Sequence, residues 1–297
     1  NVLVFFLIGL IILTINGVID DAFNLPGVVQ FAIQFIAGVL IAISVVDLST
    51  LNLPFNIQIP LELARIETTL SSIPISFIIP GDFLLVLWIM ICINAVKWMG
   101  GSDGLLESNC IVALILIYLV TVRDFDYIGS FFSIILVGSM IGYLVFNYPP
   151  AKIFTGCTGK SAYGYILAVM AVMSKAKFAV TLVILGLPLL DFVYVVIKRL
   201  VVYKPKNPLA ILRINSRDHL HHKLLDLGFS NKKVILIETT SMLLIGLFGF
   251  YAIGAKRFII LIVLGILVLG AIFLLDVARK KYKAKKDTKS PESKYSY

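Results

Sequence analysis

The chain has 297 residues, of which 59% are hydrophobic and only 14% are charged, and its formal net charge is +9. Its mean hydropathy is +0.99, whereas a soluble globular domain carries roughly 25% charged residues. This composition excludes a soluble globular protein, and the lack of a soluble basic domain argues against binding to nucleic acid.

Nine apolar segments approach or reach the roughly 20 residues that a helix needs to cross a bilayer. Because lipid offers no partners for backbone amides, such segments are helical. We therefore predict an all-α polytopic membrane protein whose membrane domain covers residues 1–278. The predicted spans are residues 2–18, 28–46, 83–99, 108–122, 129–147, 161–175, 177–197, 233–254 and 258–277.

The distribution of lysine and arginine predicts the orientation of these spans, since cytoplasmic loops carry the excess of basic residues. With the N-terminus outside and the C-terminus inside, 20 of the 26 basic residues fall on the inside face. The positive charge then forms a collar facing the anionic lipid of the cytoplasmic membrane. The chain starts at Asn1 without the features of a signal peptide, and we expect it to be an N-terminally incomplete fragment.

Three segments outside the spans have a distinct composition. The outside loop 47–82 contains short β-like runs and prolines, which predict a hairpin or a re-entrant piece. The inside loop 198–232 is the largest on its face. The tail 279–297 is polar and basic, and we expect a helix end that becomes disordered in the cytosol.

The first predicted span ends in two adjacent carboxylates, Asp20 and Asp21, within GVIDDAFNLPG. A charged carboxylate costs about 2.5–3.5 kcal/mol at the centre of a bilayer, so the pair belongs at the membrane boundary. Two interpretations are open: a solvated helix end or cap, and a base or cation site.

Glycines and prolines mark the next two inside loops. Three glycines surround Asp103 in NAVKWMGGSDGLL, which forms either a plain turn or a close approach to a ligand. After Asn147, two prolines stop a helix, and Lys152 presents a cation that binds an anion or simply snorkels. The sequence GCTGK at 156–160 lacks the spacing of a phosphate-binding P-loop, which argues against a nucleoside triphosphatase.

All three histidines lie within four residues of the loop 198–232. On a helix, His219 and His222 would share a face while His221 would point elsewhere. A zinc site would need further Cys or carboxylate ligands close by, and the cysteines of the chain show no such spacing. With Arg217 beside the imidazoles, a diphosphate is the better ligand.

The polar loops all fall on the inside face, so we expect them to converge on one cleft. Asp191, inside the span 177–197, is a functional candidate or pairs with a neighbouring lysine. The segments that carry these residues resemble, in this order and over nearly the whole chain, the polyprenyl-phosphate N-acetylhexosamine-1-phosphate transferases, the glycosyltransferase 4 family. They are GVIDDAFNLP, NAVKWMGGSDGLLE, GYLVFNYPPAKIFTGCTG, LPLLDFVYVVIKRL and RDHLHHKLLDLGFS.

The resemblance implies transfer of a sugar-1-phosphate from a UDP-N-acetyl sugar to polyprenyl phosphate with release of UMP, the first membrane step of cell-wall or surface-glycan synthesis. It implies Mg²⁺ or Mn²⁺ as cofactor, membrane lipid and a second copy of the chain as partners, and a cytosolic active face. Its implied catalytic residues are Asp20, Asp21 and Asp103, and Asp21 and Asp103 are also the implied metal ligands. The implied substrate-binding residues are Asn94, Lys97, Asn147, Lys152, Arg217, His219, His221 and His222.

Four positions depart from the family pattern: Lys97 stands in place of an Asn, Gly100 and Cys157 in place of Asp, and Lys160 in place of a Ser. Lys97 and Cys157 stand where the resemblance implies ligands of Mg²⁺, which prefers oxygen donors. An ammonium group cannot ligate a metal, and a thiolate prefers softer ions. Lys97 could replace the charge of the metal, the three aspartates could hold Mg²⁺ with the substrate phosphates, or the transfer could be lost.

The alternatives to an enzyme belong to other functional classes. A non-catalytic member of the family would bind lipid phosphate or nucleotide without turnover, as the altered positions suggest. A transporter or channel has only Asp191 in its favour, because the sequence shows no pair of broken helices in corresponding halves.

Overall fold

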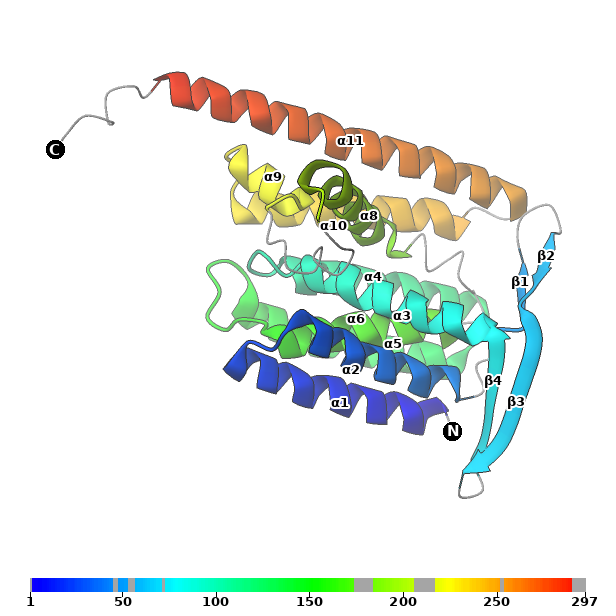
Figure 1. Ribbon diagram of the computed structural model, residues 1–297. Helices are drawn as coiled ribbons and strands as arrows, with labels where there is room; N and C mark the ends of the chain where they lie inside the picture. Colours follow the sequence, from blue (N-terminus) through cyan, green and yellow to red (C-terminus); the bar gives the residue numbers. More distant parts are fainter. Residues whose placement is uncertain are drawn as a thin grey trace.

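The computed structural model describes residues 2–44, 48–52, 57–70, 73–173, 184–205, 217–251 and 254–289. Helices account for most of these residues, as Figure 1 shows. They are α1 (Val2–Phe23), α2 (Gly27–Ala42), α3 (Gly81–Trp98), α4 (Leu105–Arg123), α5 (Tyr127–Asn147), α6 (Cys157–Met173), α8 (Gly186–Lys198) with the π-helical turn η2 (Arg199–Tyr203), α9 (Leu220–Asp226), α10 (Asn231–Tyr251) and α11 (Gly254–Lys289).

Six of the described helices are long and apolar enough to cross a membrane: α1, α3, α4, α5, α10 and the stretch Ile259–Lys285 of α11. The apolar helix α2 is shorter, with 16 residues. The chain is thus a helical, multi-pass membrane protein, although the described helices support six spans rather than the predicted nine. The junction between the predicted spans 161–175 and 177–197 lies outside the described residues.

Close contacts between backbones place α6 beside α1 and α3. A Cβ atom added to Gly17 would lie 2.3 Å from Cα of Thr158, and one added to Gly164 would lie 2.7 Å from Cα of Ile93. Small residues of this kind let membrane helices approach closely, because packing replaces the hydrophobic effect as the force between them. The contact at Gly17 brings the end of α1 to the start of α6, where the polar residues gather.

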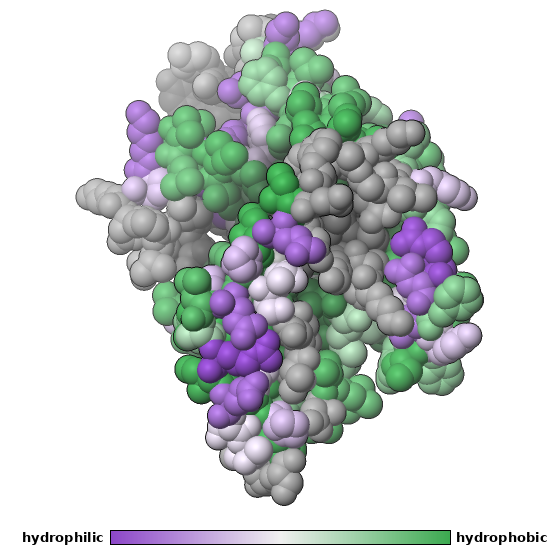
Figure 2. Space-filling model, turned by 90° about the vertical axis from the view of Figure 1, so that its right-hand side faces the viewer, coloured by the Kyte–Doolittle hydropathy of each residue, from purple (hydrophilic) through white to green (hydrophobic). Residues whose placement is uncertain are grey.

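Two antiparallel hairpins cover the opposite end of the bundle from α9 (Figure 1). Strand β1 (Thr50–Asn52) pairs with β2 (Gln58–Pro60), and β3 (Glu62–Leu70) pairs with β4 (Ile73–Pro80). The predicted hairpin within 47–82 is confirmed, and these strands are a small addition to a mostly helical membrane protein. Figure 2 looks onto this end and shows a band of hydrophilic residues flanked by hydrophobic ones.

Helix α11 continues well beyond the predicted end of the last span at residue 277. It remains helical through Lys289, so the helix end predicted in the tail 279–297 extends over eleven residues, and residues 290–297 lie outside the described residues. The reason is local pairing, since Arg279 and Lys283 of this extension form ion pairs with Asp226 of α9. The extension therefore belongs to the folded protein and reaches the histidine-bearing helix.

Candidate functional site

The carboxylate of Asp21 caps the N-terminus of α6. Its Oδ1 accepts a hydrogen bond of 2.7 Å from the backbone N–H of Cys157, and its Oδ2 accepts from the N–H and hydroxyl of Thr158 at 3.3 and 3.1 Å. The first N–H groups of a helix lack partners within the helix and attract negative charge. Asp21 supplies that charge from another helix, which agrees with the interpretation as a cap, while the interpretation as a base or cation site stays a prediction.

Asp20 belongs to a separate chain of contacts that ends at Lys97. Oδ1 of Asp20 accepts hydrogen bonds from the Leu25 N–H and from Nε2 of Gln30, each 2.8 Å long. The amide oxygen of Gln30 in turn accepts a hydrogen bond from Nζ of Lys97. Gln30 thereby joins the aspartate pair to α3, a role that the sequence analysis did not foresee.

The side chain of Asn94 has a structural task in this part of the fold. Its Nδ2 donates to Oε1 of Gln34 at 2.6 Å and to the Met90 carbonyl at 2.8 Å. The residue is buried, and these bonds fasten α3 to α2. Asn94 therefore positions Lys97 one turn further along α3 and does not itself present donors to the site.

The glycine loop 100–104 lies between Lys160 and the histidines. A Cβ atom on Gly100 would lie 2.5 Å from Cε of Lys160, and one on Gly101 would lie 2.3 Å from Nε2 of His221. A side chain at position 101 would displace the buried ring of His221, whereas the flexible end of Lys160 could move away from one at position 100. The glycine loop, which is the second inside segment, and the histidine loop thus meet, as predicted.

A cavity of about 200 Å³ opens beside this loop. Glu107 is buried in its wall and accepts a hydrogen bond from the hydroxyl of Thr155. Glu107 is not among the predicted site residues, although it is the last residue of the segment NAVKWMGGSDGLLE. The residues that line the cavity are Gly100, Gly101, Ser102, Asp103, Leu106, Glu107, Asn147, Phe154, Thr155 and Lys160.

Asn147 shapes this cavity through the backbone. Its Oδ1 accepts from the Gly104 N–H and its Nδ2 donates to the Ile153 carbonyl, both at 2.7 Å. Asp103 makes a long contact of 3.4 Å with the Ala151 N–H. Lys152 is exposed and does not line the cavity, so it joins the site less directly than the sequence predicted.

The histidine loop is held by Asp191. Oδ2 of Asp191 lies 2.8 Å from Nδ1 of His219, and its Oδ1 accepts from the Leu220 N–H at 2.9 Å. Asp191 thus pairs with a histidine and not with a lysine. Helix α9 begins only at Leu220, so the predicted shared face of His219 and His222 is wrong, and His219 instead stacks on His221 with ring centroids 5.8 Å apart.

The imidazole of His221 is buried and neutral. Burial lowers its pKa to about 2, and repulsion from His222 and other cations acts in the same direction. Burial also lowers the pKa of His222. Nε2 of His221 and Nδ1 of His222 have no hydrogen-bond partner among the described residues. Buried polar atoms of this kind need a partner, which a ligand in the cavity can supply.

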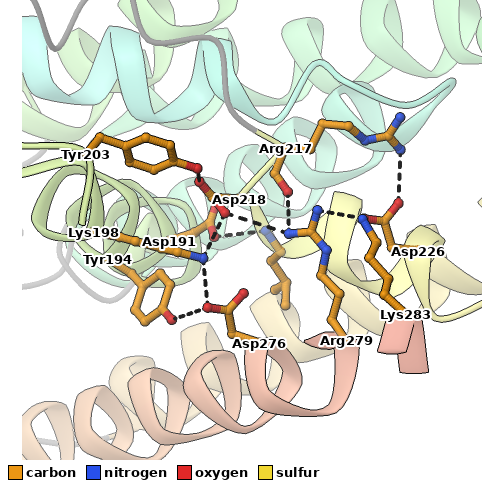
Figure 3. Close-up of polar contacts among 11 residues, drawn as sticks. Asp191, Tyr194, Lys198, Tyr203, Arg217, Asp218, Asp226, Asp276, Arg279 and Lys283 are labelled. Atoms are coloured by element: carbon orange, nitrogen blue, oxygen red, sulfur yellow. Dashed lines mark hydrogen bonds and ion pairs between the residues drawn. The ribbon is translucent and has the colours of Figure 1, made fainter. Parts of the chain in front are cut away.

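Figure 3 shows an ion-pair network that fixes the start and end of α9 to α8 and α11. Nζ of Lys198 lies 2.8 Å from Oδ1 of Asp218 and 2.7 Å from Oδ2 of Asp276. Arg279 donates to the Arg217 carbonyl at 2.9 Å and pairs with Asp226 at 2.7 Å. The predicted ligand Arg217 is itself partly engaged, since its guanidinium lies 3.3 Å from Asp226.

The donors in this region do not suit a hard divalent cation. No group of three or more His, Cys, Asp or Glu side chains in the described ranges is placed to hold a metal ion. Both oxygens of Asp21 already accept hydrogen bonds from α6. Burial, and a hydrogen bond that the thiol donates to Asp20, raise the pKa of Cys157 to about 11, which disfavours the thiolate. Lys97 adds a positive charge where Mg²⁺ would need oxygen ligands.

Comparisons with known proteins show which family the chain belongs to. A family model described as glycosyl transferase family 4 matches residues 3–175. The chain is 26% identical over 278 residues to the probable undecaprenyl-phosphate N-acetylglucosaminyl 1-phosphate transferase of Bacillus subtilis. The matched region covers 91% of this chain and 71% of that protein.

Two further relatives match smaller parts. The phospho-N-acetylmuramoyl-pentapeptide-transferase of Bacillus velezensis is 32% identical over 172 residues, covering 58% of this chain and 51% of its own length. The decaprenyl-phosphate N-acetylglucosaminephosphotransferase of Mycobacterium leprae is 25% identical over 252 residues, covering 76% of this chain and 58% of its own length. The chain thus spans about half to two thirds of several relatives that it matches.

Proposed function

Because the chain belongs to glycosyl transferase family 4, we propose that it transfers an N-acetyl sugar-1-phosphate from a UDP-sugar to a polyprenyl phosphate and releases UMP. The names of its relatives include undecaprenyl-phosphate and decaprenyl-phosphate N-acetylglucosamine transferases. The product would be a lipid-linked sugar diphosphate, the first membrane intermediate of a cell-wall or surface glycan.

In this reaction an oxygen of the lipid phosphate attacks the β-phosphorus of the UDP-sugar. The bond between that phosphorus and the oxygen bridging to the α-phosphate breaks, and UMP leaves with the bridging oxygen. The phosphoryl group carries negative charge on its equatorial oxygens throughout, so positioning and positive charge provide most of the catalysis.

The observation that supports this function best is the meeting of four distant segments at one end of the bundle. Asp21 contacts the start of α6, Gly100 contacts Lys160, and Gly101 contacts His221. The cavity beside them is lined by a glycine loop, a lysine and carboxylates, and Nε2 of His221, which has no hydrogen-bond partner among the described residues, lies at the adjoining Gly101. These groups suit a phosphorylated ligand better than an apolar one.

We further propose the orientation in the membrane. The N-terminus lies outside, the C-terminus lies inside and the site faces the cytosol, because 20 of the 26 basic residues then fall inside. Nine spans, including the predicted segments 161–175 and 177–197, are compatible with this orientation. The hairpins β1–β2 and β3–β4 would then lie on the outer face of the cytoplasmic membrane, and a homodimer is the proposed assembly.

The direct test is an assay with the purified full chain in detergent, UDP-N-acetylglucosamine and undecaprenyl phosphate. The assay is run with Mg²⁺, with Mn²⁺ and without a divalent cation, and we expect UMP release under at least one of these conditions. No release above a heat-killed control under any of these conditions, from protein shown to be folded, would contradict the proposal for this donor. A second assay with UDP-N-acetylmuramoyl-pentapeptide as the donor distinguishes a different sugar specificity from a lack of transferase activity.

A second candidate function is binding without turnover, and Lys97 and Cys157 favour it because they replace oxygen ligands. It predicts that UDP-sugar binds to the purified protein and is recovered intact. Turnover of any donor would rule it out.

A further inference from the structure

We propose that Lys97 and Lys160 hold the diphosphate of the donor by their own positive charge, so that nucleotide binding does not require a divalent cation. This inference rests on the proposed function and concerns how the same site neutralises its ligand. It also resolves the disagreement between the metal that the family implies and the donors that this chain carries.

Lys160 is the cation closest to the cavity. It belongs to the first turn of α6, its stem packs on Gly100, and it lines the cavity. No ion pair joins it to another described residue, whereas Lys198, Arg279 and Lys283 are all paired with carboxylates. Its charge is therefore available to a ligand.

Lys97 approaches the aspartate pair through Gln30. Its Nζ donates a hydrogen bond to the amide oxygen of Gln30, a neutral acceptor, and it forms no ion pair with another described residue. Its charge also acts on the Cys157 thiol, which places it at the start of α6. An ammonium group carries three N–H donors, so two of them remain for phosphate oxygens.

His221 provides the second, independent indication of a ligand. It is 1% exposed, and its Nε2 points at Gly101 without a hydrogen-bond partner among the described residues. A buried polar atom that stays unsatisfied destabilises the protein, because it has lost its hydrogen bonds to water without replacing them. A phosphate oxygen or its bridging oxygen beside the glycine loop would satisfy it.

The carboxylates of the site are occupied by protein donors and so compete little for these lysines. Asp21 is bonded to Cys157 and Thr158, Asp20 to Leu25 and Gln30, and Glu107 to Thr155. Hydrogen bonds from charged donors to phosphate are about twice as strong as neutral ones. Two fixed ammonium groups can thus balance the two negative charges of a diphosphate diester, which a single Mg²⁺ balances elsewhere.

The test measures binding of UDP to the purified full chain by calorimetry, once with EDTA and once with Mg²⁺. We expect dissociation constants that agree within about threefold, and competition by inorganic pyrophosphate in EDTA. Lys160→Gln and Lys97→Gln should each weaken binding in EDTA by roughly ten- to a hundredfold, the size of a lost charged hydrogen bond. Lys160→Arg keeps the charge and should lose less than Lys160→Gln.

Lys233→Gln is the matched control, because Lys233 is exposed on α10 and does not line the cavity. UDP binding that requires Mg²⁺ would overturn the inference and leave the proposed function standing. No UDP binding under either condition would count against both. Unchanged affinity in folded Lys160→Gln and Lys97→Gln proteins would also overturn the inference. If a variant fails to fold, the comparison of EDTA with Mg²⁺ in the wild-type protein still tests the inference.

Discussion

The carboxylate of Asp21 lies 2.7 Å from the backbone N–H of Cys157, which is 136 residues further along the chain. This contact joins the end of the first helix to the start of α6 and places both beside Lys97. A helix N-terminus capped by a carboxylate from another helix is both a packing contact and an electrostatic one.

Replacing Asp21 should destabilise the protein in a graded manner. Asp21→Asn keeps one acceptor and should lower the free energy of unfolding slightly, whereas Asp21→Ala should lower it by about 0.5–2 kcal/mol, the usual value of a lost cap. The thermal midpoint in detergent measures both. Equal midpoints for the wild type and Asp21→Ala would show that the cap contributes nothing to stability.

Asp191 should act as a positioning residue for His219. Asp191→Asn keeps the shape of the side chain but removes the charge that holds Nδ1 of His219 and the Leu220 N–H. A lost charged hydrogen bond is worth about 1.5–3 kcal/mol, so we expect kcat to fall roughly ten- to a hundredfold. A merely structural role would instead lower the thermal midpoint and leave the kcat of the folded fraction unchanged.

Acid should destabilise the protein through His221. Its pKa is about 2 in the folded state, against 6.5 in the unfolded chain, and burial is the main cause. Above pH 6.5 both states are unprotonated and the contribution is constant. Below pH 6.5 only the unfolded chain binds the proton, so the free energy of unfolding falls by up to about 1.4 kcal/mol per pH unit.

The thermal midpoints at pH 7.5 and pH 5.0 check this expectation. The drop between them should be smaller in His221→Gln than in the wild type, at the same scan rate. His222 adds to the drop in both proteins, because burial lowers its pKa as well. A drop of the same size in wild type and variant would show that His221 does not carry the effect.

The extension of α11 should hold the histidine helix in place. Arg279→Gln removes the pairing with Asp226 and the bond to the Arg217 carbonyl. Since Lys283 still pairs with Asp226, we expect a loss of stability of about 1–3 kcal/mol, below the 3–5 kcal/mol of a fully broken buried pair. Hydrogen exchange of residues 217–228 should become faster.

Lys281→Gln is the control for that experiment, because Lys281 is exposed on the same helix and forms no ion pair with a described residue. If exchange is unchanged in Arg279→Gln, or rises equally in Lys281→Gln, the network does not position α9.

Restoring oxygen donors should create a metal site. The double variant Lys97→Asn and Cys157→Asp brings a third carboxylate beside Asp20 and Asp21 and removes a cation, which gives Mg²⁺ the hard ligands that it prefers. We expect millimolar Mg²⁺ to raise the thermal midpoint of this variant and to leave the midpoint of the wild type unchanged. A shift of equal size in both proteins would show that the wild-type site already binds the ion.

Local features of the sequence predicted much of this fold. Long apolar runs identified the membrane helices, and the prolines and β-like runs of 47–82 identified a hairpin, because both signals lie within one short segment. The motif order also pointed to the segments that form the site. The sequence did not predict how far α11 continues, because a run of lysines is typical of a solvated tail. The aspartate that pairs with Lys283 lies on another helix, α9.

The contacts that define the site are long-range, and no local pattern contains them. Gln30 bridges Asp20 and Lys97, which are more than seventy residues apart in the chain. The histidine pairing was predicted wrongly because helical spacing was assumed at His219, which instead precedes the helix with an extended backbone held by Asp191.

The central claim is that one cavity carries out the transfer of a sugar-1-phosphate to a lipid phosphate. The most direct measurement quantifies UMP and the lipid-linked product by mass spectrometry in the same reaction of the full chain. The account predicts equal molar amounts of the two, both strongly reduced in His219→Ala. UMP without lipid-linked product, or neither from a folded protein with any UDP-N-acetyl sugar, would contradict it.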